Sequence, residues 1–336
     1  MDNPKVAIIV LNWNGKNDTL ECLASIGKMD YPSIDVILVD NGSQDGSVAA
    51  IQRKFPEVMI VETKSNLGFA GGNNMGIRYA LRNGAEYVLV LNNDTIVDPQ
   101  LIKSFLASST INPNAGIFGA KIYYYYHPNK IWYAGGRWVK NESNFIHIGM
   151  GCVDNGQDYS SVVETDYVCG CALFIRAEVL KKIGLFDEEY FLMFEETDLC
   201  YRAKRAGFKC LIVPNAKVWH KISVSFGGNE SGTYCYFMMR NRLLWAEKNL
   251  PIGGRLMLYR HVLGELFRCI TPPRICWNNN GKGLSIETIS HWLIEYKVTF
   301  VNKYRKPANK AKLLGARDYV LRHFGNCPNS VRSLGK

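Results

Sequence analysis

Short apolar runs that stop at polar clusters divide the first hundred residues of the chain. The runs cover residues 6–12, 34–39, 58–61 and 87–91 and are rich in Val, Ile and Leu. Runs this short, without polar alternation, predict strands buried on both faces of a parallel sheet. The last run is expected to be the central strand, and Asn92, Asn93 and Asp94 follow it directly.

Segments with helical periodicity separate these runs. The first has inward-facing apolar positions and a capping-box pattern: Leu20, Leu23 and Ile26, with Asp18 as the cap and Glu21 three residues later. Two more helices are expected, one through residues 49–55 and one from about residue 71 to residue 81. Strands that alternate with helices imply right-handed crossovers. The pattern therefore predicts an α/β fold with a mostly parallel central sheet flanked by helices.

Polar residues gather at the ends of three predicted strands: Asn12 and Asn14, Asp40 and Asn41, and Asn92, Asn93 and Asp94. In open α/β sheets, ligands bind beyond the carboxyl ends of the strands, so these clusters are expected to line one cleft that suits a nucleotide. Asp94 is able to ligate a hard cation there. By itself the last cluster is equally consistent with a turn, since Asn and Asp both favour turns.

A glycine-rich stretch, residues 66–74, adds a fourth polar cluster with Asn66, Gly71, Gly72 and Asn73. Its glycines allow the backbone to approach a phosphate, and the N-terminus of the helix that follows favours an anion. Neither the glycine fingerprint of dinucleotide-binding enzymes nor a Walker A motif occurs in the sequence. An NAD-dependent enzyme and a P-loop NTPase are therefore both disfavoured.

Small residues interrupt another apolar segment. Residues 166–175 predict a strand in which Gly170 and Cys171 leave room for a substrate against the backbone. Cys169 and Cys171 would share one face of that strand, but a Cys-x-Cys pattern without a second pair is more often core packing than a metal site. His220 follows a further buried run, and a lone histidine at such a point is more often structural.

Composition sets the outer limits. With 336 residues, 47% of them hydrophobic and 21% charged, the chain is able to bury a full core as one large domain or as a domain with an appendage. The first apolar run is too short for a signal peptide and lacks a cleavage site. Ten cysteines without CxxC pairs predict reduced thiols. Together these features predict a cytoplasmic protein.

The net charge of +10 is concentrated in the C-terminal part. Residues 1–239 carry 22 Lys and Arg against 25 Asp and Glu, whereas residues 240–336 carry 18 against 5. A segment this basic could meet nucleic acid, an anionic membrane or an acidic substrate. Nucleic acid is disfavoured as a partner, because a cleft rich in carboxylates would repel it.

The same basic part predicts two amphipathic helices. Their apolar faces hold Leu256, Tyr259, Val262, Leu263, Leu266, Phe267 and Ile270, and Ile286, Ile289, Trp292, Leu293 and Tyr296. These faces would either pack on the preceding domain or, with basic residues beside them, lie on an anionic lipid surface. No apolar run is long enough to span a bilayer. We expect packing together with peripheral membrane contact.

Five motifs, taken in order, resemble the inverting family 2 glycosyltransferases of the GT-A fold, particularly their rhamnosyltransferase-like branch. They lie at residues 9–14, 39–43, 66–74, 91–94 and 194–199 and read IVLNWN, VDNGS, NLGFAGGNN, LNND and FEETDL. The resemblance covers roughly residues 5–245. It implies a GT-A domain over residues 1–245, with a nucleotide-sugar-binding half to about residue 100 and an acceptor-binding half from about residue 101. Residues 246–336 would then form a basic, helical C-terminal extension.

The resemblance assigns roles on the donor side. Asp40 would hydrogen-bond the base of a nucleoside diphosphate sugar, and Asp94 would be the metal-binding carboxylate of the DXD element. The first Asp of that element is Asn92 here, whose amide adds no charge and lowers the expected metal affinity. In related enzymes a histidine at the position of His220 completes the metal and diphosphate site. We therefore expect Asp94 and His220 to bind a divalent cation, Mg²⁺ or Mn²⁺.

It also assigns roles on the acceptor side. An inverting transfer needs one carboxylate as general base, which takes the proton of the attacking hydroxyl. By resemblance to the family's Glu-Asp motif, Glu196 occupies that position, where relatives often have Asp. Asp198 would support it from the next turn, and Gly170 with Cys171 would lie against the acceptor. Other carboxylates nearby fit the preference of acidic side chains for the start of a helix.

The resemblance thus implies an inverting glycosyltransferase of cell-surface polysaccharide synthesis. It would move a hexose, with rhamnose as one candidate, from a nucleoside diphosphate sugar to a saccharide or lipid-linked saccharide at the inner face of the membrane. The other polar residues of the motifs are expected to bind substrate: Asn12, Asn14, Asn41, Asn66, Gly71, Gly72, Asn73, Asn92 and Asn93. The alternative is a catalytically degenerate nucleotide-sugar-binding protein, because Asn92 and Glu196 each depart from a common pattern.

Overall fold

The structure is a computed structural model that describes residues 3–140, 142–222, 231–271, 297–298 and 301–334. By its internal contacts the chain divides into two units, residues 1–222 and residues 223–336. Of the two predicted amphipathic helices, the one over residues 256–270 is described. The second, over residues 286–296, lies outside the described residues.

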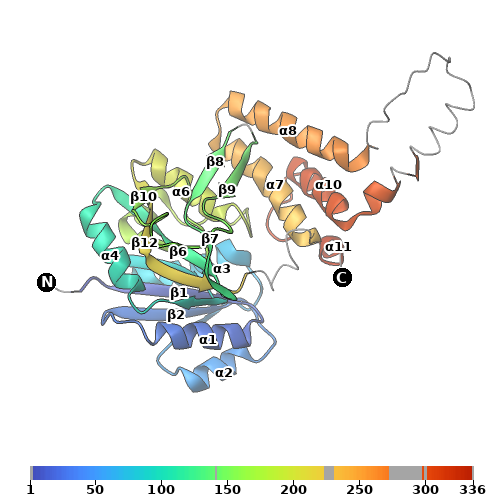
Figure 1. The fold of residues 1–336 in the computed structure, drawn as a ribbon. Coiled ribbons are helices and arrows are strands. Elements are labelled where there is room, and N and C mark those ends of the chain that lie inside the picture. Colours follow the sequence, from blue (N-terminus) through green and yellow to red (C-terminus); the bar gives the residue numbers. More distant parts are fainter. Residues whose placement is uncertain (1–2, 141, 223–230, 272–296, 299–300, 335–336) are drawn as a thin grey trace, which may run out of the picture. The chain divides into compact units, whose positions relative to one another are not determined.

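A ten-stranded sheet forms the centre of the first unit (Figure 1). Four parallel strands follow the spatial order β3, β2, β1, β4, with bounds Met59–Glu62, Ile34–Asp40, Val6–Asn12 and Tyr87–Asn92. Strand β11, Ala172–Arg176, pairs antiparallel with β4 on one side and with β6, Ala115–Tyr124, on the other. Strand β12, Lys209–His220, runs parallel to β6. The predicted α/β fold with a mostly parallel sheet is confirmed.

The remaining strands are short and lie beyond β11. Strand β5, Thr95–Val97, pairs with the end of β12, and β7, His127–Tyr133, pairs with β6. Strand β10, Val163–Glu164, forms the edge next to β12. A separate hairpin consists of β8, Gly136–Val139, and β9, Asn144–His147.

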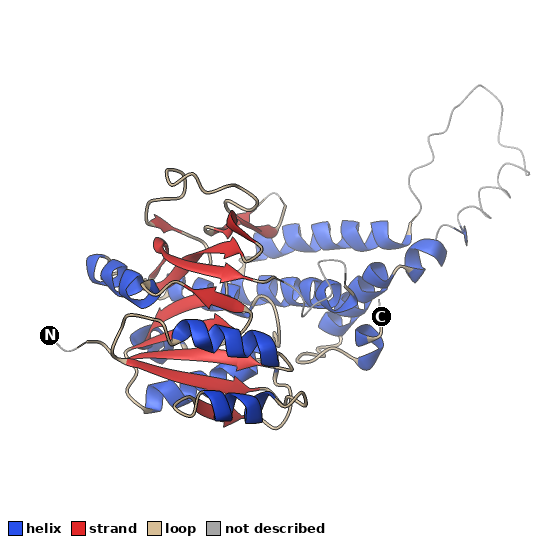
Figure 2. Cartoon of the chain, turned by 60° about the horizontal axis from the view of Figure 1, so that its bottom comes forward, coloured by secondary structure: helices blue, strands red, loops and turns tan. Residues whose placement is uncertain are grey.

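Helices cover both faces of the sheet (Figure 2). They are α1 Lys16–Ile26, α2 Ser47–Lys54, α3 Gly68–Arg82, α4 Leu101–Ile111, α5 Ala177–Ile183 and α6 Glu195–Arg205. Helices α1 and α2 lie together on one face, and α3 packs on β1 and β2 from the other (Figure 1). Right-handed crossovers require this change of face, because the connection from β3 to β4 runs back across the sheet. Residues 6–10 and 88–91 are buried throughout.

The predicted capping box of α1 is wrong. The helix begins at Lys16 after Gly15, and no side chain caps it. Asp18 lies inside the first turn, and its carboxylate pairs with Lys221, as does that of Glu21. Because the helix begins two residues before Asp18, that carboxylate is no longer at a capping position, and both acids pair with the ammonium group that follows β12.

Two other predicted boundaries differ from the structure. Helix α3 begins at Gly68, so most of the glycine-rich stretch is helical rather than a loop. The predicted strand over residues 166–175 begins only at Ala172, and Gly170 and Cys171 form a turn before it. The residues before that turn pair with the β8 hairpin instead, since the amide of Asp166 donates to the Gly136 carbonyl.

The described part of the second unit is helical, as predicted. It consists of α7 Gly232–Asn249, α8 Ile252–Ile270, α10 Pro307–Val320 and α11 Asn329–Arg332, and α7 packs against the other three. The predicted apolar face of α8 divides between two sides: Val262 is buried, whereas Leu256, Leu263 and Phe267 are exposed. No helix in the described part of the chain is long and apolar enough to cross a membrane.

Candidate active site

Hydrogen bonds join three of the polar clusters at the carboxyl ends of β1, β2 and β4. Asn12 is fully buried, and its amide donates to Asp40 Oδ1 at 2.9 Å and to Ser43 Oγ at 3.0 Å. Its Oδ1 accepts from Thr19 Oγ1 at 2.9 Å and from Asn93 Nδ2 at 3.3 Å. An amide has two donors and two acceptor positions, and all are used. Asn12 therefore holds the strand ends together with all of its side-chain hydrogen-bonding groups, and its expected role in substrate binding stays a prediction.

Asp40 differs from Asn12 in keeping spare hydrogen-bonding capacity. Its carboxylate is buried and accepts from Asn12 Nδ2 and from the Ser43 amide at 2.9 Å. A carboxylate offers about four acceptor positions, so roughly half remain for a ligand. Asn14, in contrast, is exposed and uses its Oδ1 to accept from the Gln44 amide at 2.7 Å.

Asn41 and Asn66 fasten the segment before α3. The buried amide of Asn41 donates to Asn66 Oδ1 at 3.2 Å and to the Gly68 carbonyl at 3.0 Å. Its Oδ1 accepts from the amide of Leu67 at 2.9 Å, and Asn66 Oδ1 accepts from the amide of Gly68 at 2.8 Å. These bonds shape the entry into α3, and the substrate-binding role expected of both residues stays a prediction.

Two backbone amides in the first turn of α3 are already bonded within the protein. The amides of Phe69 and Ala70 both donate to the Phe191 carbonyl, at 2.7 and 3.3 Å. The glycines that follow serve close packing: a Cβ on Gly72 would lie 2.4 Å from Leu11 Cδ1, and one on Gly71 would lie 2.9 Å from the Leu67 Cβ. The next residue, Asn73, is buried, and no hydrogen-bond partner of its Oδ1 is found among the described residues.

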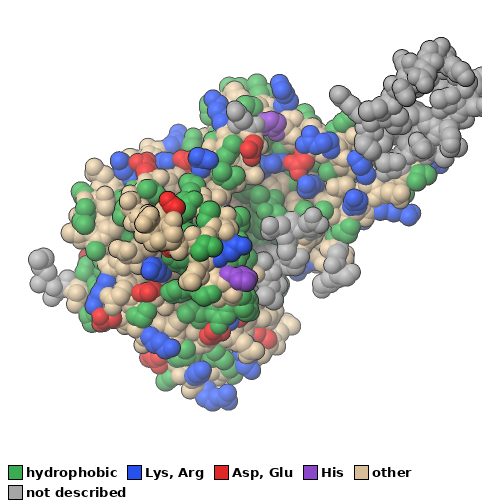
Figure 3. All heavy atoms as spheres, viewed as in Figure 1, with side chains coloured by type: hydrophobic (Ala, Val, Ile, Leu, Met, Phe, Trp, Pro, Cys, Tyr) green, Lys and Arg blue, Asp and Glu red, His purple; other side chains and the backbone are tan. Residues whose placement is uncertain are grey.

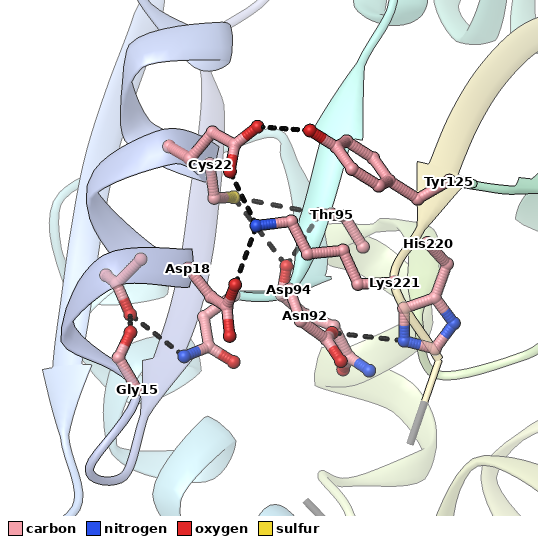
Figure 4. A network of polar contacts seen from close by, with 12 residues as sticks. Gly15, Asp18, Cys22, Asn92, Asp94, Thr95, Tyr125, His220 and Lys221 are labelled. Atoms are coloured by element: carbon pink, nitrogen blue, oxygen red, sulfur yellow. Dashed lines mark hydrogen bonds and ion pairs between the residues drawn. The ribbon is translucent and has the colours of Figure 1, made fainter. Parts of the chain in front are cut away.

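Asp94 and His220 meet at the ends of β4 and β12 (Figure 4). Asp94 Oδ1 and His220 Nε2 are 3.0 Å apart, and both side chains are largely buried. Burial works against ionisation of the carboxyl, but the contact with His220 dominates and lowers the pKa of Asp94. No hydrogen-bond partner of His220 Nδ1 is found within the described ranges. Asn92 lies beside this pair (Figure 4).

The chemistry of this pair suits a cation only in part. Among the described residues, no group of three or more His, Cys, Asp and Glu side chains is placed to hold a metal ion. Asp94 and His220 offer one carboxylate and one imidazole nitrogen. Mg²⁺ is usually held by one or two carboxylates together with substrate phosphates. The pair therefore fits a divalent cation that takes its remaining ligands from a bound diphosphate.

Lys221 connects this site to α1 and was not among the site residues expected from the sequence. Its amide donates to the Asp94 carbonyl at 2.9 Å, while its ammonium group lies 2.6 Å from Asp18 and 2.5 Å from Glu21 (Figure 4). Burial alone would lower the pKa of Lys221, but the two carboxylates raise it. Tyr125 donates to the other oxygen of Glu21 at 2.7 Å. The signal that could have pointed to Lys221 was the Asp-x-x-Glu pair on one face of α1.

Two glutamates begin α6 with buried carboxylate oxygens. Oε2 of Glu195 and Oε2 of Glu196 have no hydrogen-bond partner in the described part of the chain. Burial raises the pKa of Glu196 to about 7. The pKa of Glu195 is raised well above its ordinary value by burial and then by the charge of Glu196. A partly neutral carboxyl with one oxygen that finds no partner among the described residues is suited to exchange a proton with a ligand.

The backbone just before these glutamates is strained. Phe191, Met193 and Phe194 have φ angles of 64°, 70° and 76°, in the left-handed region that side chains of this size rarely adopt. Non-glycine residues in this region cost on the order of 1–3 kcal/mol each and collect at functional sites. We therefore regard residues 191–194 as part of the candidate site, because such strain is usually retained where function requires that backbone conformation.

Asp198 forms an ion pair within α6, with Arg202. Its Oδ2 accepts from Arg202 Nε at 2.7 Å. Arg202 also donates to the carbonyls of Ile183 and Leu185, each at 2.8 Å. This placement is compatible with the supporting role that the family resemblance implies.

The turn at residues 169–171 contacts both carboxylate sites. A Cβ on Gly170 would lie 3.0 Å from the Phe69 ring and 3.8 Å from the Glu196 Cβ. The Cys171 carbonyl accepts from the Asn92 amide at 3.0 Å. Burial raises the pKa of the Cys169 thiol, and the charges of Glu196 and Asp94 raise it further. The turn therefore joins the start of α6 to the strand end that precedes Asp94.

Known proteins resemble this chain over most of its length. A family model described as glycosyltransferase-like family 2 matches residues 4–247. An N-acetylglucosaminyl-diphospho-decaprenol L-rhamnosyltransferase of Mycobacterium tuberculosis (strain H37Rv) is 25% identical over 269 residues, 72% of this chain and 87% of the relative. A low-salt glycan biosynthesis hexosyltransferase, Agl10, of Haloferax volcanii is 27% identical over 244 residues, 71% of this chain and 74% of the relative.

Solved structures share the fold. The mannosyltransferase PcManGT from Pyrobaculum calidifontis, in complex with GDP-Man and Mn²⁺, has a TM-score of 0.56 at 14% identity, over 96% of this chain and 88% of that chain. Residues 1–349 of S. aureus TarS give a TM-score of 0.51 at 15% identity, over 95% and 92%. These neighbours confirm the predicted GT-A fold. Because the family model covers most of the sequence, the chain belongs to glycosyltransferase-like family 2.

Proposed function

We propose that the protein is an inverting glycosyltransferase that moves a hexose from a nucleoside diphosphate sugar to a saccharide. The observation that carries the proposal is that the turn at residues 169–171 contacts both candidate sites. Gly170 lies close to the Glu196 side chain, and the Cys171 carbonyl accepts from Asn92, just before the pair of Asp94 and His220. A base and a cation site that share one small-residue turn suit attack on a sugar at one site and departure of a diphosphate at the other.

In the proposed reaction Glu196 acts as the general base. Its carboxylate takes the proton of the acceptor hydroxyl while the hydroxyl oxygen forms a bond to the anomeric carbon. The bond between that carbon and the diphosphate oxygen breaks, and the diphosphate leaves with the electron pair. A single displacement inverts the anomeric configuration. The proton remains on Glu196 until product leaves, and a pKa of about 7 suits both states.

The donor would be held at the carboxyl ends of the parallel strands. Asp40 has acceptor positions left for the N–H groups of a nucleobase, whereas Asn12 and Asn41 orient the loops around it. Asp94 and His220 would hold the divalent cation. When bound, the cation neutralises the charge that develops on the leaving diphosphate.

The acceptor is proposed to be a lipid-linked saccharide at the inner face of the membrane. The Mycobacterium tuberculosis relative is named for a decaprenol-linked acceptor and for rhamnose transfer. Rhamnose is therefore the first sugar to test, with other hexoses following because the Haloferax volcanii relative is named a hexosyltransferase. Synthesis of cell-surface glycans is the corresponding process.

The proposal is tested by identifying the donor and then following the transfer. Nucleoside diphosphate sugars are screened for those that raise the unfolding temperature of the purified protein, since only ligands of the folded state do so. Transfer from the best donor is then compared between the native protein and Glu196→Gln. We expect a product of inverted configuration and a large loss in the variant. Stabilisation by a donor without any turnover would favour the degenerate, binding-only protein, and retained configuration would exclude the mechanism.

A further inference from the structure

Helix α8 carries an uncovered apolar stripe. Ile252, Leu256, Leu263 and Phe267 are 74%, 63%, 66% and 64% exposed. Their spacing puts all four on one side of the helix, and at 1.5 Å per residue they extend over roughly 22 Å of its axis. The side of α8 that packs within the second unit holds Leu258, Val262 and Cys269. The stripe is therefore not needed to attach the helix to its own unit.

The unit that carries this stripe has an excess of positive charge. Residues 231–271 and 301–334 carry 14 Lys and Arg against three acidic residues. Each acid is paired internally: Glu247 with Arg322 at 2.7 Å, Glu265 with Arg242 at 2.5 Å and Lys312 at 2.8 Å, and Asp318 with Arg317 at 2.6 Å. The positive charge that remains is therefore not balanced by acids of these two segments. On the face in view in Figure 3, this part of the chain shows more Lys and Arg side chains than Asp and Glu side chains.

One cation of α8 itself lies close to the stripe. Arg260 is exposed, and helical spacing puts it at the edge of the stripe, whereas the exposed Arg268 is turned about 100° away from Phe267. An apolar face with exposed arginines on the same helix is the pattern of a helix that lies in the plane of an anionic bilayer. The apolar side chains enter the boundary between headgroups and acyl chains, and the guanidinium groups contact lipid phosphates.

The geometry points to α8 as the surface by which this protein docks on an anionic lipid bilayer. A second copy of the chain is a poorer occupant of the stripe, because pairing would bring two units of the same positive charge together. The inference rests on the proposed function and adds a partner to it: the bilayer that would hold a lipid-linked acceptor. The surface itself does not depend on which sugar is transferred.

Vesicle flotation of the full-length protein tests the inference. One set of vesicles is phosphatidylcholine alone, and the other contains about one third phosphatidylglycerol, which supplies the anionic surface. We expect binding to the anionic vesicles at low salt, at least about tenfold weaker binding to the neutral ones, and progressive release as salt is added. Leu256→Ser combined with Phe267→Ser should weaken binding at least about tenfold, because the apolar anchor is lost.

Matched variants separate the apolar from the electrostatic contribution. Arg260→Ser combined with Arg268→Ser should weaken binding to anionic vesicles and reduce its salt dependence. Ile111→Ser, which removes an apolar side chain of α4 that is 78% exposed, should leave vesicle binding unchanged.

Several outcomes would overturn the docking surface. They are unchanged vesicle binding by the double serine variant of α8, equal binding to neutral vesicles, or conversion of a dimer to a monomer by that variant in light scattering. A fall of its unfolding temperature by several degrees would show that other residues of the chain cover the stripe. Stabilisation by a sugar nucleotide without vesicle binding would remove this surface and leave the proposed function standing.

Discussion

At the scale of single residues, Glu196 lies in an environment that disfavours its charge. Burial raises the pKa of its carboxyl to about 7, and only the deprotonated form is a base. The transfer rate should therefore rise as the pH rises through about 7. Glu196→Gln keeps the shape and removes the basicity, so transfer should fall by on the order of a hundred- to ten-thousandfold. Rates measured from pH 5.5 to 8.5, with roughly half-unit steps, check both expectations.

The same substitution has a second readout, in stability. The pKa of Glu196 is higher in the folded protein than the ordinary value of 4.5, so the folded state favours the protonated form. The associated stability is complete below the unfolded pKa and is lost as the pH rises through about 7. Glu196→Gln should thus unfold at a higher temperature than the native protein at pH 8 and at a similar temperature near pH 5. Destabilisation at both pH values would indicate a structural role instead.

Asp94 is expected to be required through its charge. Asp94→Asn removes the charge with little change of shape, and transfer should fall below detection in the variant because the diphosphate is no longer neutralised. In the native protein, excess chelator should stop transfer and added Mn²⁺ or Mg²⁺ should restore it. Isothermal titration of Mn²⁺ in the presence of the donor supplies a readout that does not depend on turnover. Full activity of Asp94→Asn in chelator would exclude the cation site.

At the scale of elements, Lys221 joins the end of β12 to α1. Its two ion pairs fix the strand end that carries His220, and its amide is bonded to the Asp94 carbonyl. Lys221→Met should therefore raise the cation concentration needed for half-maximal transfer, on the order of tenfold, as removal of a supporting residue of a metal site does. Lys217→Met is the matched control on the same strand and should behave like the native protein. Equal cation requirements in both variants would contradict the role of Lys221.

The contact between α3 and the strained segment before α6 makes a second prediction at this scale. Gly68 has a φ of +75°, and a Cβ there would lie 2.3 Å from the Phe191 carbonyl oxygen. Gly68→Ala should displace that segment and with it Glu196, so the turnover number should fall at least about tenfold because small misplacements are costly in catalysis. Gly84→Ala is the matched control, because Gly84 has a similar φ of +79° but its added Cβ would contact no other atom. A smaller loss of turnover in Gly68→Ala than in Gly84→Ala would argue against the coupling.

Elements could be predicted from the sequence where the decisive interactions are local. The strands follow from apolar runs such as residues 87–91, because burial on both faces leaves no other pattern. The start of α3 was missed because Gly and Asn are poor helix formers, and the helix is extended by bonds to Phe191, far along the chain. The capping box of α1 was misread for the same reason, since Lys221 lies 200 residues from Glu21.

The candidate site shows a similar division. Residue types alone predicted a ligand near the amides at the strand ends, which stays a prediction, but not that Asn12 and Asn41 use all their hydrogen-bonding groups within the protein. Asp94 and His220 were paired by resemblance to a family, and the structure brings them to 3.0 Å. The positive φ angles of Phe191 and Phe194 could not be predicted from the sequence, because tertiary contacts hold the backbone in this strained conformation.

At the scale of the whole molecule, the two parts of the chain differ in charge and in proposed task. Donor binding by the first part and lipid binding by the second should therefore respond differently to salt. Residues 1–239 carry 22 Lys and Arg against 25 Asp and Glu, and residues 240–336 carry 18 against 5. The donor is expected to bind through short, largely buried contacts, which salt screens weakly, whereas α8 meets lipid through exposed charges. Raising the salt from about 0.05 M to about 0.5 M shortens the screening length from roughly 14 Å to roughly 4 Å. Vesicle binding should fall at least about tenfold over this range, while the donor-induced rise in unfolding temperature should stay nearly constant. Loss of donor stabilisation in parallel with vesicle release would mean that the basic part of the chain also holds the diphosphate.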